Sequence, residues 1–480
     1  METLVSDKTV TNVGYFTEDQ KKAYVEILDW IKAPYSPNNY KRALSGAAGT
    51  GKTFLIKSII HDCKISYSKI GLSAPTHKAA RILAKSIEGL DVRVKTIQSD
   101  LGLRLNLARE DFDVDNPPFD PKGQIHVGEF ALYIVDEASM ISKSLVTLLE
   151  RVCVQNQVKL LYSGDSFQLF PVNEKKSTAF SSTKTLTLTQ VVRQDDTNPV
   201  KKLLNILRED VQNNTFKFLE YIHKNRYEFD ADNTKGFCVC NLEQFKEFVL
   251  NNFNDNEFVN NIDLARIVAY TNQRVSDWNY FVRNNLVKDC EKSVITRHDL
   301  LLSYITIVDD FLSPIITNSE EYIIKDIVNY VHPKYELKGF MVKLQAINGG
   351  GVTKPLFILD HSDRFNAVMY KKISDSKINR AKSTRNSNDW KDYYEFKNDV
   401  LLATNIIDRS NNTNIQRTID YGFAITAHRS QGSTYENVLV DVNDIVYDSN
   451  GFPRSDGEVQ RRLYVACSRC KNKLYLLYGN

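Results

Sequence analysis

A glycine-rich segment has the residue types and the spacing of a loop that binds phosphate groups. It runs Gly46, Ala47, Ala48, Gly49, Thr50, Gly51, Lys52 and Thr53, and it matches G-x-x-x-x-G-K-[ST] in full. Its glycines let successive backbone N–H groups turn toward one anion. The Lys52 ammonium can reach the β- and γ-phosphates, and the Thr53 hydroxyl can bind Mg²⁺. We therefore predict a nucleotide site that uses Mg²⁺.

The flanking residues predict the strand, loop and helix order that such a site requires. Residues 42–45 form a short extended stretch before the loop. After it, apolar residues recur at helical spacing, at Ile56, Ile59, Ile60 and Cys63. The start of that helix adds its partial positive charge to the phosphate site. The alternative, a chance glycine turn, does not require this context.

Polar residues at the ends of two later strands can complete the site. Residues 130–135 are a continuous apolar run, typical of a buried parallel strand, and Asp136 and Glu137 follow directly. Asp136 can hold the Mg²⁺ shared with Thr53, and Glu137 can orient and deprotonate a water for attack on the γ-phosphate. Gln168 follows a third strand and can sense the γ-phosphate. This alternation of strands and helices predicts a doubly wound α/β sheet.

Three further polar positions are weak signals when each is taken alone. Gln20 lies in a helical pattern before the phosphate loop, where its amide can contact an adenine edge. Two helix starts, within residues 75–78 and 94–99, can contact a phosphate chain, but ordinary helix caps explain them equally well. The residues concerned are Pro75, Thr76, His77, Lys78, Thr96 and Gln98.

Length and composition limit the class of protein. A chain of 480 residues is too long for one core, so two to four domains are expected. The net charge of +3 predicts a local nucleic-acid groove rather than a basic surface. We find no apolar run of membrane-spanning or signal-peptide length, which predicts a cytoplasmic protein with no membrane partner. Seven scattered cysteines predict no disulfide framework, and the Cys467 and Cys470 pair is interpreted as structural.

A second α/β unit follows the first and is interrupted by a segment of different character. Its strands are predicted at 265–271, 437–442 and 473–478. Residues 296–414 show alternating apolar positions and glycine turns, which predict a small β-barrel-like insertion with an extended stretch at 367–371. The basic residues of 371–391 predict a solvated loop, with a polynucleotide contact as the alternative.

Two late stretches carry polar residues that can act on the nucleotide. Residues 426–434 are polar and precede a strand, and they include Thr426, His428, Gln431 and Gly432. Residues 459–469 have helical spacing and leave Arg469 near the helix end. An arginine from a second lobe can stabilise transition-state charge on a γ-phosphate.

In this order and spacing the motifs resemble those of the superfamily 1B DNA helicases, most closely the Dda-type helicases of bacteriophages. The resemblance covers nearly the whole chain. It runs from Gln20 and the phosphate loop through 74–78, 96–99, 136–139, 164–168 and 189–193 to 426–433 and 464–469. It implies ATP and Mg²⁺ as cofactors, catalytic roles for Lys52, Glu137, Gln168, Arg193 and Arg469, and nucleotide contacts by Gln20, Gln431 and Gly432.

The resemblance also implies a domain organisation. The fold class would be α/β, with two RecA-like P-loop NTPase domains, a pin insertion in the first and an SH3-like β insertion in the second. The implied bounds are 1–100 and 130–190 for domain 1A, 101–129 for the pin, 191–295 and 415–480 for domain 2A, and 296–414 for the β insertion. Pro75, Thr76, His77, Lys78, Thr96, Gln98, Thr426 and His428 would contact single-stranded DNA, and Phe112 or Phe119 of the pin would separate strands.

The function predicted in this way is ATP-dependent translocation on single-stranded DNA and unwinding of forked duplex DNA, with 5′-to-3′ polarity, in replication, recombination or repair. A functional monomer, single-strand-binding or replication proteins as partners, and the host cytoplasm if the gene is phage-encoded complete the expectation. Three alternatives stay open: a P-loop kinase, a non-catalytic nucleic-acid clamp, and an RNA helicase.

Overall fold

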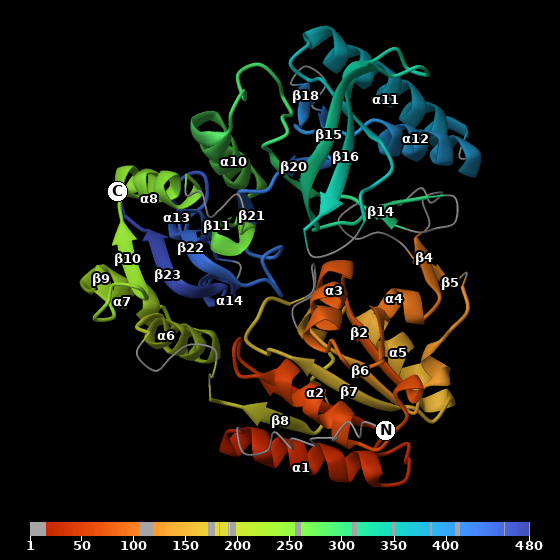
Figure 1. The fold of residues 1–480 in the computed structure, drawn as a ribbon, viewed down its shortest axis with the longest axis vertical. Coiled ribbons are helices and arrows are strands. Elements are labelled where there is room, and N and C mark those ends of the chain that lie inside the picture. Colours follow the sequence, from red (N-terminus) through yellow and green to blue (C-terminus); the bar gives the residue numbers. More distant parts are fainter. Residues whose placement is uncertain are drawn as a thin grey trace, which may run out of the picture.

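The computed structural model describes residues 16–105, 119–121, 123–170, 178–181, 183–190, 192, 198–254, 261–309, 314–347, 351–384, 386–408, 413–455 and 457–479. Figure 1 shows a first lobe (red to yellow), a second lobe (green and blue) beside it, and a β-rich insertion (teal). Each lobe contains a six-stranded sheet with helices packed on it, so the predicted α/β fold with two RecA-like domains is confirmed.

The first lobe is built on a fully parallel sheet with the strand order β3-β2-β6-β7-β1-β8. Strands β2, β6 and β7 are buried along their whole length, as expected where helices cover both faces. Strand β1 lies between β7 and β8 and leads directly into the phosphate loop. The strands are β1 Lys41–Gly46, β2 Ile70–Ala74, β3 Arg93–Thr96, β6 Leu132–Val135, β7 Lys159–Gly164 and β8 Thr185–Leu188.

Helices on the two faces of this sheet enclose two apolar cores. Leu132 and Ile134 of β6 belong to the core under α1, α2 and α3, whereas Tyr133 and Val135 belong to the core under α5, because alternate residues of a strand point to opposite faces. The helices are α1 Glu18–Lys32, α2 Lys52–Asp62, α3 His77–Ser86, α4 Ile97–Asp100 and α5 Lys143–Gln155. Short 3₁₀ turns lie at Tyr67–Lys69, Val127–Glu129 and Ala138–Met140.

A small hairpin projects from the first lobe where the pin is predicted. Strand β4 (Leu103–Leu105) pairs antiparallel with β5 (Phe119–Pro121), as Figure 1 shows at the side of the lobe. Phe119 therefore begins the returning strand of the hairpin. Phe112 lies outside the described residues, so the assignment of a strand-separating aromatic residue stays a prediction.

The second lobe repeats the plan with the strand order β21-β11-β22-β23-β10-β9, in which only the edge strand β9 is antiparallel. Its strands are β9 Tyr227–Phe229, β10 Gly236–Cys240, β11 Ala265–Ala269, β21 Ala424–Thr426, β22 Tyr435–Asp441 and β23 Cys470–Leu477. Its helices are α6 Val200–Asn213, α7 Lys217–Lys224, α8 Leu242–Phe253, α10 Asn272–Leu286, α13 Val442–Val446 and α14 Val459–Ser468, and a 3₁₀ turn lies at Ile262–Leu264.

The insertion is an antiparallel sheet with the order β17-β16-β15-β12-β20. Its apolar side shares one core with the second lobe, because Leu301 and Val342 of the insertion belong to the same cluster as Ala265 and Leu439. The insertion is therefore packed onto the second lobe. Its strands are β12 Leu300–Ser303, β15 Glu321–Val331, β16 Lys338–Ala346, β17 Leu356–Leu359 and β20 Ile419–Tyr421, with small pairs β13 Ile307–Val308 and β14 Pro314–Ile316, and β18 Ile406–Asp408 and β19 Thr413–Ile415.

Two predictions about the insertion are wrong. The stretch 367–371, expected to be extended, and the segment 371–391, expected to be a loop, lie in helices α11 (Arg364–Thr384) and α12 (Ser387–Asp399). The helices form because an aromatic cluster packs between them, and Lys377 pairs with Asp392 across the two. Basic residues within 371–391 suggested solvation, but several of them neutralise nearby carboxylates instead.

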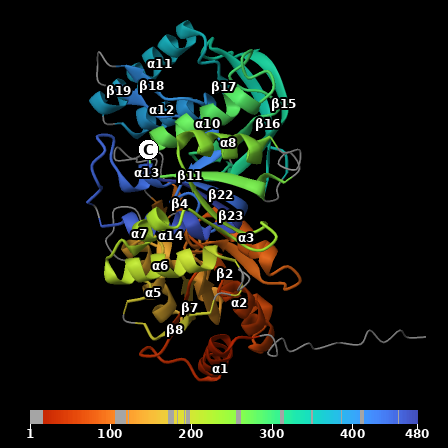
Figure 2. The same cartoon turned by 90° about the vertical axis from the view of Figure 1, so that its left-hand side faces the viewer.

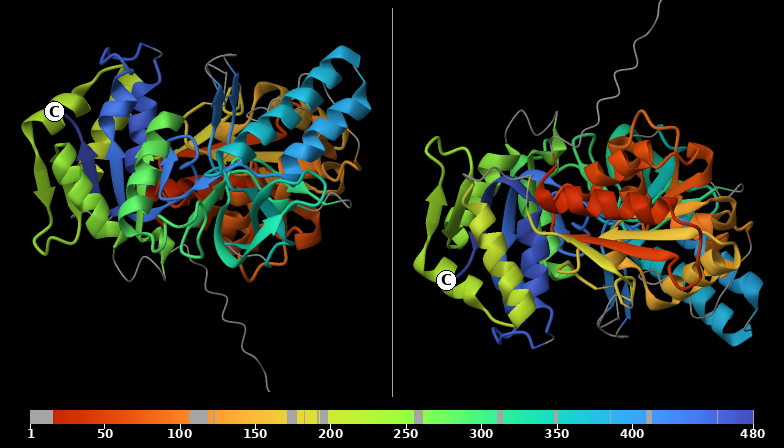
Figure 3. Two further views of the ribbon diagram at one scale, coloured as in Figure 1. Left: turned by 90° about the horizontal axis from the view of Figure 1, so that it is seen from above. Right: turned by 90° about the horizontal axis from the view of Figure 1, so that it is seen from below.

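The arrangement of the three parts is seen best from the side. In Figure 2, α11 and α12 lie at the end of the molecule opposite α1. Figure 3 shows the C-terminus on the side away from the α11 and α12 pair. Within the described ranges, no helix is both long and apolar enough to cross a membrane.

Candidate functional site

The phosphate loop joins β1 to α2 with the backbone geometry that its glycines permit. Gly51 precedes the first residue of α2 with φ +77°, a left-handed conformation that favours glycine. The Lys52 ammonium donates to the carbonyl oxygens of Gly46 (2.7 Å) and Ala47 (3.1 Å). The lysine is thus folded onto the loop, at the position from which it can turn to a bound phosphate.

Gln20 lies against the loop and supports its backbone. Its Nε2 donates to the carbonyl oxygen of Thr50 at 2.9 Å, while its Oε1 accepts the N–H of Thr17 at 2.9 Å in the capping box of α1. The side chain is buried, and a Cβ at Gly51 would stand 2.5 Å from its Nε2. The predicted contact with adenine stays a prediction, and it would have to be made by the remaining hydrogen-bonding capacity of this amide.

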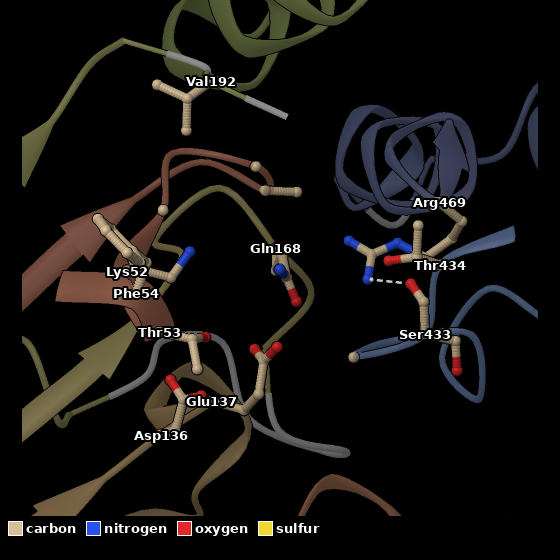
Figure 4. Close-up of a pocket in the computed structure, with 14 residues that line it drawn as sticks. Lys52, Thr53, Phe54, Asp136, Glu137, Gln168, Val192, Ser433, Thr434 and Arg469 are labelled. Atoms are coloured by element: carbon tan, nitrogen blue, oxygen red, sulfur yellow. Dashed lines mark hydrogen bonds between the residues drawn. The ribbon is translucent and has the colours of Figure 1, made fainter. Parts of the chain in front are cut away.

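The strand-end carboxylate predicted to bind Mg²⁺ faces the loop hydroxyl. Asp136 follows β6, and its Oδ1 accepts the hydroxyl of Ser163 at 2.8 Å. Figure 4 shows the side chains of Asp136 and Thr53 close together at the edge of the pocket. A carboxylate and a hydroxyl, with phosphate oxygens and waters, make up a donor set that Mg²⁺ accepts. The residues present therefore fit the ion.

Glu137 is held in an unusual backbone conformation and points into the pocket. Its φ is +51°, in the left-handed region that is rare for residues other than glycine. Among the described residues, its Oε2 is buried without a hydrogen-bond partner. Burial, and then the charge of Asp136, raise the pKa of the Glu137 carboxyl above its ordinary value. A carboxylate oxygen that is buried and free of hydrogen bonds to the described residues is suited to accept a proton from a water.

The opposite wall of the pocket comes from the second lobe. Arg469 follows α14, and its guanidinium donates to the carbonyl oxygen of Ser433 at 3.3 Å and to the hydroxyl of Ser468 at 2.7 Å. Figure 4 shows Arg469 across the pocket from Lys52, with Gln168 and Glu137 between them. The cavity has a volume of about 270 Å³ and lies between the two lobes.

A side-chain contact also joins the lobes at the back of this pocket. Gln431 Nε2 donates to Gln168 Oε1 at 3.4 Å, which connects the glutamine predicted to contact the nucleotide from the second lobe to the one predicted to sense the γ-phosphate. Gly432 has φ +76°, and a Cβ there would stand 3.9 Å from Glu137 Oε1. Glu137 and Gly432 therefore face one another across the lobes.

Sequence reasoning placed most of the pocket residues and omitted a few. Arg193 lies outside the described residues, so its role stays a prediction. The pocket wall also includes Phe54, Val192, Ser433 and Thr434. Three of these are immediate neighbours of predicted residues along the chain, and that adjacency was the available signal.

The residues predicted to contact DNA lie at strand ends, where several of them have other partners. Thr76 and Thr96 cap α3 and α4 by accepting the N–H groups of Ala79 and Ser99, at 3.1 and 3.2 Å. Pro75 and Thr76 are half-buried and His77 is exposed, at the start of α3, and Gln98 is half-buried on α4. Thr426 is the last residue of β21 in the second lobe, and His428 follows this strand. Their contacts with DNA stay predictions.

Lys78 differs from the other predicted DNA contacts because it is buried in an ion pair between the first lobe and the insertion. Its ammonium stands 3.2 Å from Glu321 Oε2, and Glu321 also pairs with Arg266 of β11 at 3.1 Å. These cations lower the pKa of Glu321, although burial opposes them. One helical turn further, Arg81 pairs with Glu320 at 2.9 Å.

The same segment of the insertion also contacts the second lobe. Arg429 Nη1 donates to Asn318 Oδ1 at 2.7 Å and to the hydroxyl of Ser319 at 2.9 Å. Residues 318–321, which lead into β15, therefore lie between the start of α3 and the turn after β21. We call residues 318–321 the bridging segment.

The sheets and the shared pocket define a two-lobed P-loop protein in which residues of both lobes line the pocket at the phosphate loop. A family model described as an AAA domain matches residues 19–224. An uncharacterized protein of Acanthamoeba polyphaga mimivirus is 24% identical over 495 residues, which cover 90% of this chain and 94% of that protein.

The phage helicase that the sequence resembles is also found among the relatives. The ATP-dependent DNA helicase dda of Enterobacteria phage T4 is 26% identical over 279 residues, 56% of this chain and 57% of that protein. Among solved structures, the Pif1 helicase from Candida albicans is 17% identical with a TM-score of 0.49, and 97% of this chain and 94% of that one are covered. The family model and the phage relative confirm the predicted resemblance to superfamily 1B helicases of the Dda type.

Proposed function

We propose that this protein is an ATP-dependent DNA helicase that translocates on single-stranded DNA and unwinds forked duplexes with 5′-to-3′ polarity. The observation that carries the proposal is the shared pocket, in which the phosphate loop of one lobe faces Arg469 of the other. Such a pocket makes lobe closure depend on the nucleotide. The phage T4 relative, named as an ATP-dependent DNA helicase, supports the choice of polymer.

The residues of the first lobe have distinct roles in the proposed hydrolysis. Lys52 leaves the loop carbonyl groups and binds the β- and γ-phosphates. Thr53 and Asp136 would hold Mg²⁺, which would neutralise charge on the phosphates when bound. Glu137 accepts the proton of the attacking water, and Gln168 senses the γ-phosphate.

The second lobe converts hydrolysis into movement. Arg469 binds the γ-phosphate, and the same role is predicted for Arg193. Bound ATP therefore holds the two lobes together, and its hydrolysis lets them separate. Groups at the start of α3 and in the turn after β21 belong to different lobes, so their grip on the DNA backbone can alternate. Contacts to phosphates rather than base edges imply little sequence preference.

The finer expectations form part of the same proposal. We retain domain 1A at 1–100 and 130–190, the pin at 101–129, domain 2A at 191–295 and 415–480, and the β insertion at 296–414, although strand β20 of the second 2A range pairs with β12 in the sheet of the insertion. A functional monomer in the cytoplasm, acting with replication or single-strand-binding proteins, is the expected setting.

The proposal is tested by unwinding of forked duplexes that carry one single-stranded tail at a time. We expect ATP-dependent unwinding with a 5′ tail only. A requirement for a 3′ tail would contradict the polarity but not the ATPase function. In the same preparation, the rate of ATP turnover should rise when single-stranded DNA is added. A rate that neither DNA nor RNA changes would favour the kinase. A rate that only RNA raises would favour an RNA helicase.

A further inference from the structure

Helix α14 of the second lobe is hydrogen-bonded to the loop that follows β7 in the first lobe. Arg461 Nη1 donates to the carbonyl oxygens of Ser166 (2.8 Å) and Gln168 (2.9 Å). Three residues further along, Tyr464 lies on the same face of the helix, and its hydroxyl donates to Asp165 Oδ2 at 2.8 Å. Two consecutive turns of one second-lobe helix are therefore bonded to a single first-lobe loop.

The Tyr464 hydroxyl also reaches the phosphate loop. It accepts the backbone N–H of Ala48 at 3.3 Å, and Asp165 Oδ2 accepts the same N–H at 3.1 Å. The Tyr464 side chain is fully buried, and its ring packs edge-on against Phe167 at 6.3 Å. One phenol thus joins the second lobe, the loop after β7 and the phosphate loop.

The helix that makes this contact also presents Arg469. Helix α14 ends at Ser468, and Arg469 is its C-cap residue. Because the backbone hydrogen bonds of a helix make it move as a unit, an anchor at Tyr464 sets where Arg469 stands relative to the phosphate loop. Tyr464 itself does not line the pocket, so it would act through these neighbours.

We propose that Tyr464 is a positioning residue for ATP hydrolysis: its hydroxyl ties α14 to Asp165 and to the Ala48 N–H, and so couples the phosphate loop to the placement of Arg469. This inference rests on the ATPase function proposed above. It assigns to Tyr464 and Asp165 a role in the rate of hydrolysis rather than in nucleotide affinity.

The test is a double-mutant cycle on the full-length chain, with ATP hydrolysis measured at saturating single-stranded DNA. Tyr464→Phe keeps the ring against Phe167 and removes only the hydroxyl. We expect kcat to fall about tenfold while KM for ATP changes less than about twofold. Asp165→Asn should also lower kcat. The kcat of the double variant should be no lower than that of the more impaired single variant, because both substitutions remove the same hydrogen-bonded link between Tyr464 and Asp165.

The matched control is Tyr133→Phe. Tyr133 is also fully buried and donates its hydroxyl to a carboxylate, Asp100 Oδ2, at 2.9 Å, but this pair lies within the first lobe. Tyr133→Phe should keep the wild-type kcat, while its thermal unfolding temperature changes about as much as that of Tyr464→Phe. The inference is overturned if the wild type hydrolyses ATP and Tyr464→Phe has the same kcat. It is also overturned if the kcat losses of Tyr464→Phe and Asp165→Asn multiply in the double variant, or if Tyr133→Phe lowers kcat as much as Tyr464→Phe does. A wild type without DNA-stimulated hydrolysis would overturn the proposed function, and this inference with it.

Discussion

At the scale of the residue, the pocket contains one carboxylate oxygen, Glu137 Oε2, that has no hydrogen-bond partner in the part of the chain that the structure describes. Glu137 is half-buried beside Asp136 and its Oε2 is buried, which costs free energy unless a bound group compensates. Its left-handed backbone adds a further cost. Such costs persist where they serve a function, and here they aim one oxygen into a pocket lined by Lys52 and Arg469.

Glu137→Gln should therefore separate hydrolysis from binding. We expect ATP hydrolysis to fall about 10²-fold or more, because the amide cannot accept the proton of the water. Single-stranded DNA should still bind, as measured by fluorescence anisotropy. Glu88→Gln, on an exposed glutamate of the same lobe, is the control. Unchanged hydrolysis in Glu137→Gln would support the clamp alternative.

Lys52→Ala tests whether the phosphate loop serves movement rather than DNA affinity. Hydrolysis and unwinding should be lost, because the phosphate loop loses the cation that binds the β- and γ-phosphates. DNA affinity without nucleotide should stay within about twofold, since the Lys52 ammonium donates to carbonyl groups of its own loop. Lys57→Ala on the same helix, whose ammonium bonds to the Glu88 carbonyl, should behave as wild type. Loss of DNA binding in a folded Lys52→Ala protein would count against this assignment.

At the scale of the element, the helical pair α11 and α12 has a small core of its own. Trp390 is buried and stacks on Tyr394 at 6.1 Å between ring centroids, while Ala381 lies on the facing helix. This cluster is separate from the core that joins the insertion to the second lobe. The pair can therefore loosen without disturbing the nucleotide site.

Trp390→Ala should destabilise this pair locally, by about 3–5 kcal/mol, because it leaves a large cavity in a small core. Hydrogen exchange should accelerate across residues 364–399, while nucleotide binding by the first lobe is kept. Phe365→Ala, which removes an exposed aromatic side chain of α11, should change neither. Equal acceleration in both lobes would show that the pair belongs to the global folding unit.

At the scale of the whole molecule, the bridging segment forms ion pairs with Lys78, which the resemblance assigns to DNA, and with Arg81 one helical turn further along α3. Its Glu320 and Glu321 neutralise Arg81 and Lys78 of the first lobe. A DNA phosphate that binds these cations must displace a carboxylate. We therefore expect the insertion to move away from α3 when DNA binds.

Glu320→Gln should raise the affinity for single-stranded DNA by about three- to tenfold at low salt, because Arg81 then becomes available to a phosphate. The slope of log affinity against log salt should steepen by about one counterion. Anisotropy titrations at several salt concentrations measure both effects. Glu336→Gln removes the same charge from an exposed turn of the same sheet and should change affinity far less. Weaker binding by a folded Glu320→Gln protein would show that Glu320 orders the site instead.

Local patterns predicted most of the two lobes and of the nucleotide site. The phosphate loop is a contiguous motif, and so is the pair of carboxylates after β6. Because the carboxyl ends of parallel strands meet at one edge of a sheet, the two motifs are brought together by the order of strands in the chain. Helices α11 and α12 were missed because their stability comes from an aromatic cluster and from ion pairs across the pair, and neither produces a regular period.

By itself the sequence determined the phosphate loop, the strand-end carboxylates and the arginine at the end of α14, because each depends on residues adjacent in the chain. Only the tertiary structure decided which partners the remaining polar groups take. Lys78 and Glu321 are separated by 243 positions, and Ala48 and Tyr464 by 416. Packing of the lobes buries these groups together, and burial makes their pairing obligatory. A lysine predicted to contact DNA thus lies in an ion pair between the first lobe and the insertion, and a tyrosine without a predicted role contacts the phosphate loop.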